Sequence, residues 1–135
     1  MKLNFPAPVP EIPVSDLFRA LEYYKQMLGF QVDWQDDSIG LAGISRHECR
    51  LFLATESFRS ANGNVAPLRI WINLDSKDAV DDLYGEWKEC GAIIQAAPES
   101  KPWGLHEFTE EDSDGNLFRI FYDFATPERE AGASN

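Results

Sequence analysis

The stretch "EEDSDGNLFRIFYDF", residues 110–124, changes abruptly from acidic to apolar. Four of its first five residues are carboxylates, and an arginine, Arg119, interrupts the apolar run that follows. Asp114-Gly115-Asn116 lies between two strand-like segments, and Gly and Asn accept the positive φ angles of tight turns. The ligand spacing of an EF-hand calcium loop is missing. The stretch therefore predicts a β-hairpin and argues against a calcium site.

Side-chain alternation explains how an arginine fits into this strand, because successive residues of a strand point to opposite faces. Within residues 117–124 the even positions are all apolar or aromatic, whereas Arg119 and Phe121 occupy odd positions. Within residues 68–74 the even positions are aliphatic, whereas Arg69 and Trp71 occupy odd ones. One face of each strand suits packing beneath a helix. The other face mixes aromatic and guanidinium groups, which suits the wall of a cavity.

The chain repeats one pattern twice. Two segments with apolar residues at helical spacing, residues 15–30 and 75–92, each follow a short strand and precede extended segments. Superimposing Ile12-Pro13-Val14 on Ile72-Asn73-Leu74 brings the glycines that end the two helices into register to within about two residues. The sequence therefore predicts an α+β fold of two tandem modules, each with the order strand, helix, strand, strand, strand.

We expect these modules to form a single domain over residues 1–135. Module one spans about residues 5–56, a linker about 57–66 and module two about 67–126. The small and polar tail, residues 127–135, is expected to fray.

Composition narrows the classes of partner. The 135 residues include 12 Lys and Arg against 23 Asp and Glu, a formal net charge of -11. This balance argues against nucleic acid and anionic membranes and favours a cationic ligand. No run approaches the ~20 apolar residues of a membrane helix, and the N-terminus lacks the apolar segment of a signal peptide. Cys49 and Cys90 have neither disulfide nor zinc spacing. We therefore expect a reduced, cytoplasmic protein.

The two βαβββ modules, the D-x-D-G-N turn, the "PWG" at residues 102–104 and the "VSDL" at residues 14–17 together resemble the vicinal oxygen chelate superfamily. That group includes glyoxalase I, extradiol dioxygenases, fosfomycin-resistance enzymes and bleomycin-resistance proteins. The resemblance covers about residues 8–125. It implies curved mixed sheets around a cup-shaped cavity, with the helices on the outer face, and a homodimer of two chains.

The resemblance also indicates where a metal would be held. Enzymes of this superfamily carry His, Glu or Gln at four positions, which here fall on Val9, Arg69, Arg119 and on or near Leu51. Valine and leucine have no lone pair to donate, and two arginines repel a divalent cation. We therefore expect no metal and no other cofactor. A glyoxalase-like or dioxygenase-like metalloenzyme with non-standard ligands stays open as an alternative.

Aromatic and basic side chains supply the candidates for ligand binding. We expect the cavity to be lined by Trp34, Leu51, Arg69, Trp71, Trp103, Arg119 and Phe121. For Trp34 and Trp103, a role as partly exposed packing residues stays open. The candidate catalytic groups are Glu11, Glu107 and His106, although no set of nucleophile, base and orienting residue is legible.

The sequence leaves three possible functions. The chain resembles the bleomycin-resistance proteins most, which predicts a metal-free protein that sequesters an amphipathic or aromatic small molecule, such as a bleomycin-like antibiotic. The alternative is a metal-independent lyase or isomerase, in which Arg69 and Arg119 hold a small carboxylate substrate. A third possibility is a scaffold whose cup is filled by its own side chains.

Overall fold

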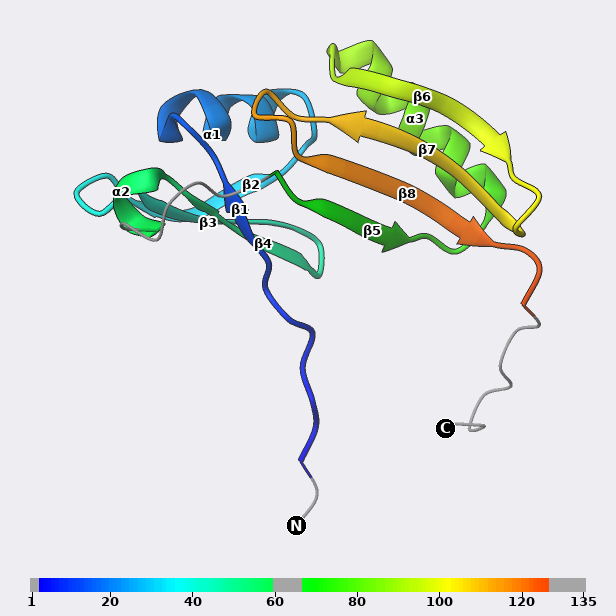
Figure 1. Cartoon of the computed structure of the whole chain (residues 1–135), viewed down its shortest axis with the longest axis horizontal. Coiled ribbons are helices and arrows are strands. Elements are labelled where there is room, and N and C mark those ends of the chain that lie inside the picture. The colour runs from blue at the N-terminus through cyan, green and yellow to red at the C-terminus, as the bar shows by residue number, and fades with distance from the viewer. Residues whose placement is uncertain (1–2, 60–66, 127–135) are drawn as a thin grey trace. The chain divides into compact units, whose positions relative to one another are not determined.

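The computed structural model describes residues 3–59 and 67–126 (Figure 1). The chain divides into two compact units. Unit 1 comprises Met1–Leu68 with Ser113–Asn116, and unit 2 comprises Arg69–Asp112 with Leu117–Asn135. Most of the expected linker (residues 60–66) and the expected tail (residues 127–135) lie outside the described residues.

The order of elements confirms the α+β class and the two βαβββ modules. In chain order they are β1 (Glu11–Pro13), α1 (Leu17–Gln26), β2 (Gln31–Asp36), β3 (Leu41–Arg46), β4 (Cys49–Ala54), α2 (Glu56–Arg59), β5 (Arg69–Asn73), α3 (Lys77–Cys90), β6 (Ile93–Ser100), β7 (Leu105–Glu111) and β8 (Leu117–Asp123). The short helix α2 occupies the start of the expected linker. No helix among the described residues is long and apolar enough to span a membrane.

Unit 1 contains a four-stranded sheet in the order β1-β4-β3-β2, in which β1 runs parallel to β4 and the other neighbours are antiparallel. Helix α1 begins where the Asp16 carboxylate accepts a hydrogen bond from the Arg19 amide at 3.0 Å, which caps the first turn. The helix contacts β2 and β4. Its buried Tyr24 meets the ring of Phe30 edge-on, and Ile12 of β1 is fully buried.

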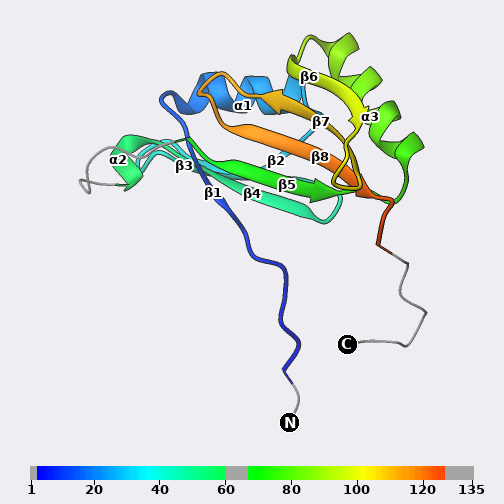
Figure 2. The ribbon, with the colours of Figure 1, turned by 45° about the vertical axis from the view of Figure 1, so that its right-hand side comes forward.

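Unit 2 repeats this plan with the strand order β5-β8-β7-β6, and β5 is parallel to β8. Helix α3 is capped by Ser76, ends at Gly91 with a φ of 97° and lies along one face of the sheet (Figure 2). Trp87 and Tyr84 of α3 place their rings 5.7 and 5.6 Å from the ring of Phe108 on β7. Even-numbered residues of β7 and β8 therefore face α3.

The turn between β7 and β8 confirms the predicted hairpin, and Gly115 adopts a φ of 87° there. The Asp114 carboxylate accepts hydrogen bonds from the Ser15 amide at 3.1 Å and the Ser15 hydroxyl at 2.7 Å. The buried Asn116 side chain donates to the Pro13 carbonyl at 2.9 Å and accepts from the Leu68 amide at 2.8 Å. The polar side chains of this turn therefore serve backbone groups of unit 1.

Replacing Asn116 by alanine should lower the free energy of unfolding by about 1–3 kcal/mol, because the Pro13 carbonyl loses a buried hydrogen-bond partner. Urea denaturation followed by circular dichroism measures the change. Ser113→Ala, at an exposed position of the same turn, is the control and should leave stability within about 0.5 kcal/mol of wild type. Equal stabilities for the two variants would contradict this role of Asn116.

Candidate functional site

The face of the unit 2 sheet opposite α3 brings together most of the predicted ligand-binding residues. Strand pairing places Trp71 of β5 beside Arg119 of β8, and Arg119 beside Thr109 of β7. Two residues further along β8, Phe121 lies opposite Glu107 of β7. We call this surface the Arg119 face, formed by Arg69, Trp71, Glu107, Thr109, Arg119 and Phe121.

Arg119 is held by two neutral groups. Its guanidinium carbon lies 5.4 Å from the centre of the Trp71 ring, within the range of a cation–π contact, and one of its nitrogens donates to the Thr109 hydroxyl at 3.2 Å. Trp71 is 48% exposed and meets Phe121 edge-on at 5.5 Å. Since neither the indole nor the hydroxyl carries charge, the guanidinium retains its capacity to bind an acceptor or anion.

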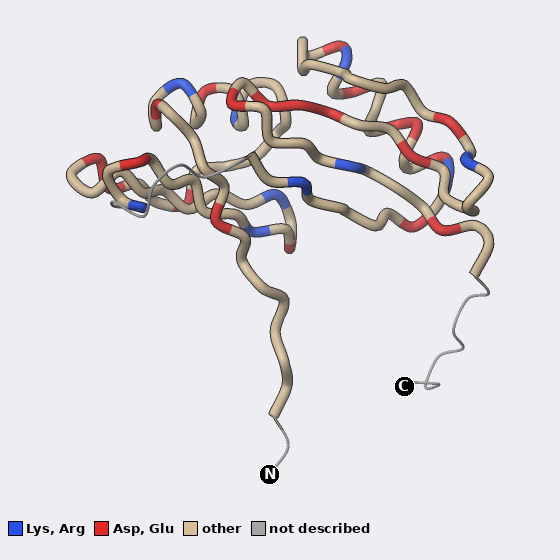
Figure 3. The backbone as a smooth tube through the Cα atoms, viewed as in Figure 1, with Lys and Arg blue, Asp and Glu red and all other residues tan. Residues whose placement is uncertain are grey.

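Charge is distributed unevenly along the chain. Acidic positions outnumber basic ones, yet basic positions occur within β5 and β8 of unit 2 (Figure 3). They correspond to Arg69, which is exposed, and Arg119, which is half-buried. The two guanidinium groups provide hydrogen-bond donors for a ligand that has an acceptor group.

Trp103 reaches the Arg119 face from the turn between β6 and β7. Its indole nitrogen donates to a carboxylate oxygen of Glu107 at 2.9 Å, while the residue as a whole stays 63% exposed. Glu107 is only 5% exposed. The sequence placed Trp103 and Glu107 in separate roles, as a ligand-binding and a catalytic candidate, and the structure joins them directly.

The next odd residue of β8, Asp123, has a structural role. Its carboxylate accepts hydrogen bonds from the backbone amides of Thr126 at 2.9 Å and Ala125 at 3.1 Å. The hydrogen bond from Thr126 is the main reason that the pKa of Asp123 is lowered from its ordinary value. Asp123 therefore fixes the end of β8. Arg119 and Phe121, on the same face, instead present a guanidinium group and an aromatic ring.

Unit 1 has an aromatic surface of its own. Pairing places Glu11 and Gly43 on either side of Phe52, and Trp34 beside Gly43. Trp34 meets Phe52 edge-on at 5.4 Å, and its indole lies against Gly43, where a Cβ atom would overlap it. We call these four residues the Trp34 face. Of the predicted residues it holds Trp34 and Glu11.

Leu51 requires a correction. It is 1% exposed, pairs with the buried Ile44 and belongs to the apolar core of unit 1. Because neighbouring residues of a strand point to opposite faces, the adjacent Phe52 lies on the Trp34 face instead. Phe52 pairs with Glu11 as Arg119 pairs with Trp71 in unit 2, so Phe52 occupies the position that the sequence reasoning assigned to Leu51.

His106 lies on the other face of β7 from Glu107. One ring nitrogen is 2.8 Å from an Asp81 carboxylate oxygen on α3, and the other is 2.9 Å from the Ser100 hydroxyl on β6. The imidazole therefore connects a helix and two strands on the helix side of the sheet. This placement separates the candidate base His106 from the residues of the Arg119 face.

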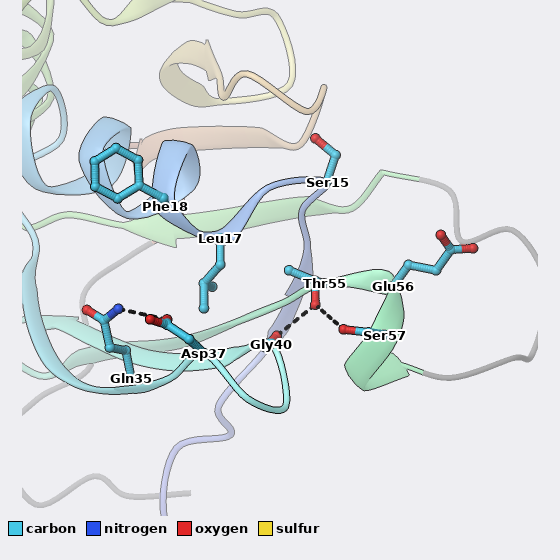
Figure 4. A pocket seen from close by; sticks show the side chains of 9 residues that line it. All are labelled: Ser15, Leu17, Phe18, Gln35, Asp37, Gly40, Thr55, Glu56 and Ser57. Carbon is cyan, nitrogen blue, oxygen red and sulfur yellow. Dashed lines mark hydrogen bonds between the residues drawn. The ribbon is translucent and has the colours of Figure 1, made fainter.

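Unit 1 also contains a groove of about 510 Å³ between the start of α1, the β2–β3 turn and α2 (Figure 4). It is lined by Ser15, Leu17, Phe18, Gln35, Asp37, Gly40, Thr55, Glu56 and Ser57. Its polar groups bond to one another, since Gln35 donates to Asp37 at 2.9 Å and the hydroxyls of Thr55 and Ser57 lie 3.1 Å apart. The predicted ligand-binding residues do not line it.

The residues at the four positions implied by the resemblance do not fit a divalent metal ion. Val9 and Phe52 supply no lone pair, and the guanidinium groups of Arg69 and Arg119 are cationic at neutral pH. Across residues 3–59 and 67–126, no three His, Cys, Asp or Glu side chains gather where they could hold a metal. The Arg119 face itself offers aromatic rings, guanidinium donors and the acceptors of Glu107 and Thr109.

Comparison with known proteins agrees with this fold. The model of the Glyoxalase/Bleomycin resistance protein/Dioxygenase superfamily matches residues 7–120. A search of curated proteins found no match.

Three solved structures illustrate the similarity. A glyoxalase/bleomycin resistance protein/dioxygenase from Nocardioides is 16% identical with a TM-score of 0.74, over 96% of this chain and 91% of that one. TioX from Micromonospora sp. ML1 is 18% identical with a TM-score of 0.72, over 87% and 98%. Lactoylglutathione lyase from Agrobacterium tumefaciens is 18% identical with a TM-score of 0.72, over 86% and 92%. These similarities support the fold alone.

Purified protein, expressed with nickel, zinc, iron and manganese in the medium, should carry none of these metals in stoichiometric amount, because Arg69 and Arg119 oppose a cation. Elemental analysis after gel filtration measures the content, with a sample dialysed against a chelator as the control. One equivalent of any of these metals, lost on dialysis, would contradict this account of the four positions.

Gly43→Ala should displace the Trp34 indole and lower the free energy of unfolding by about 1–3 kcal/mol. Gly85→Ala is the matched control, because a Cβ there meets nothing within 4 Å. In helix α3 that change should stabilise the protein by about 0.5–1 kcal/mol. Denaturation and tryptophan emission measure both effects. Unchanged emission in the Gly43 variant would show that the indole does not lie against this glycine.

Proposed function

The chain belongs to the Glyoxalase/Bleomycin resistance protein/Dioxygenase superfamily, and on this basis we propose that it binds a planar, amphipathic small molecule on the Arg119 face without a metal ion. The observation that carries the proposal is the Arg119 guanidinium, held over the Trp71 ring and against the Thr109 hydroxyl. Binding of this kind requires no covalent step, because affinity arises from preorganised contacts.

The contacts favour a ligand with an aromatic ring. Trp71 presents a half-exposed indole, and the edge-on Phe121 beside it adds a second ring. An aromatic pair contributes about 0.5–1.5 kcal/mol beyond the area that it buries. Arg119 fixes the orientation of the ligand, since a guanidinium forms charge-assisted hydrogen bonds with a carboxylate or another acceptor.

Electrostatics favours a ligand with groups of both kinds. The net charge of -11 attracts cations at long range. At the Arg119 face itself, Arg69 and Arg119 attract an acceptor or anion. An amphipathic molecule with a cationic part and an acceptor part is attracted both by the negative net charge and by the two arginines. We propose sequestration of such a molecule as the biological role, and a bleomycin-like antibiotic is one example of the class.

A second candidate function rests on Glu107, which shares the Arg119 face with two arginines and is almost fully buried. In this alternative, Arg69 and Arg119 hold a small carboxylate substrate and Glu107 acts as the general base of a metal-independent lyase or isomerase. The two functions differ in what is recovered. Sequestration returns the ligand unchanged, whereas the enzyme returns a product that mass spectrometry detects.

Thermal unfolding with a panel of probes tests the proposal, with bleomycin, 8-anilinonaphthalene-1-sulfonate and benzoate as the ligands. A probe at about 100 times its dissociation constant should stabilise the wild-type protein by about 2.7 kcal/mol. Arg119→Met should weaken binding of that probe at least about tenfold, because the charge-assisted hydrogen bond is lost.

Lys88→Met on α3 is the matched control, because Lys88 also lies over an aromatic ring, at 5.6 Å from the centre of Tyr84. This variant should bind the probes as wild type does. Equal affinities for the Arg119 and Lys88 variants, or no stabilisation of the wild type by any probe, would contradict the proposed function.

A further inference from the structure

Glu107 is a buried carboxylate with unused capacity to accept hydrogen bonds. It is 95% shielded from solvent, as its exposed fraction is 5%. Its donor among the described residues is the indole nitrogen of Trp103, which bonds to one carboxylate oxygen at 2.9 Å. A carboxylate has about four acceptor sites, so the hydrogen bond from Trp103 leaves most of them available. Glu107 is therefore suited to receive further N–H donors.

The surroundings of Glu107 favour a donor over another acceptor. Across β6 and β7, Glu99 lies directly opposite Glu107, and like charges in that position repel. Glu99 forms an exposed ion pair with Lys101 at 2.9 Å, so Lys101 is engaged with Glu99 and not with Glu107. On the other side, Glu107 lies opposite the apolar Phe121. A cationic or N–H group of a ligand would thus provide Glu107 with the hydrogen-bond donor that Glu99 and Phe121 do not provide.

Trp103 is largely exposed, and its indole nitrogen bonds to Glu107. The indole belongs to a 63% exposed residue in the β6–β7 turn, where the Gly104 amide donates to the Lys101 carbonyl at 3.0 Å. Lys101 also lies 5.7 Å from the ring centre. Because most of Trp103 is exposed, its displacement loses the bond to Glu107 and only the packing of the buried third of the residue.

We propose that Glu107 binds an N–H donor of the ligand and that the Trp103 indole occupies this position until the ligand displaces it. The inference rests on the proposed function, since it assigns a second polar contact within the same site. Trp103 is then a reversible substitute for the ligand and not a stacking platform.

The position of Arg119 defines the class of ligand further. Arg119 is the diagonal neighbour of Glu107, because Glu107 pairs with Phe121, two residues along β8. Backbones in this relation lie about 7–8 Å apart. The ligand is therefore a planar aryl compound with an amidinium, guanidinium or amine at the Glu107 end and a carboxylate or similar acceptor at the Arg119 end.

Calorimetric titration of the full chain with three probes tests the assignment. Benzamidine offers the donor, benzoate the acceptor and 4-amidinobenzoate both. The wild type should bind 4-amidinobenzoate at least about tenfold more tightly than benzoate. Glu107→Gln should weaken both amidinium probes about tenfold and leave benzoate unchanged. Glu99→Gln, the control on the opposing strand, should alter each affinity less than about twofold.

Trp103→Phe provides the second variant, because it removes the indole N–H and keeps an aromatic ring. It should tighten binding of 4-amidinobenzoate by about 2- to 10-fold, since the ligand no longer competes with an internal donor. Benzoate affinity should not change. Comparing nuclear magnetic resonance spectra of this variant and the wild type identifies the indole N–H signal of Trp103. In the wild type, this signal should shift when benzamidine is added and should not shift when benzoate is added.

The outcomes separate the two claims. The role of Glu107 and Trp103 is overturned if Glu107→Gln has no more effect on affinity than Glu99→Gln, or if Trp103→Phe weakens binding. In that case, benzoate binding that is lost in Arg119→Met would still support the proposed function. If none of the three probes binds the wild type, the proposed function fails and this inference fails with it.

Discussion

The parallel pairing of β5 with β8 is the constraint on which the Arg119 face depends. In the observed register Trp71 lies beside Arg119, and Ile70 and Ile72 lie beside Phe118 and Ile120. A slip of one residue would turn the guanidinium toward α3 and the apolar side chains away from it. Burial of an unpaired arginine costs several kcal/mol, so the apolar and charged residues fix the register together.

The same alternation made much of unit 2 predictable from sequence. Even positions of residues 68–74 and 117–124 are apolar or aromatic, so the sequence alone assigns Arg69, Trp71, Arg119 and Phe121 to the opposite face. The turn around Gly115 was predictable as well, because it needs a positive φ. In both cases the signal is local, since it depends on neighbours within a few positions.

Features that depend on distant partners were not predictable. The bond from Asn116 to Pro13 joins residues 103 positions apart, and no local pattern encodes it. In β4, apolar side chains occur on both faces. The sequence therefore shows no alternation there that would assign Leu51 to the core and Phe52 to the Trp34 face. His106 could point either way, and its partner on α3 became evident only from the packed structure.

Arg69 and Arg119 lie where the resemblance implies two metal ligands, and we propose that, with Trp71, they bind an aryl ligand in place of a metal ion. A crystal structure of the protein grown with 4-amidinobenzoate would locate the ligand and any metal ion. We expect the carboxylate of the probe against Arg119, its ring over Trp71 and its amidinium against Glu107. A probe bound in the groove beside Phe18, or a metal ion coordinated on the Arg119 face, would show that this surface does not bind ligands in the proposed way.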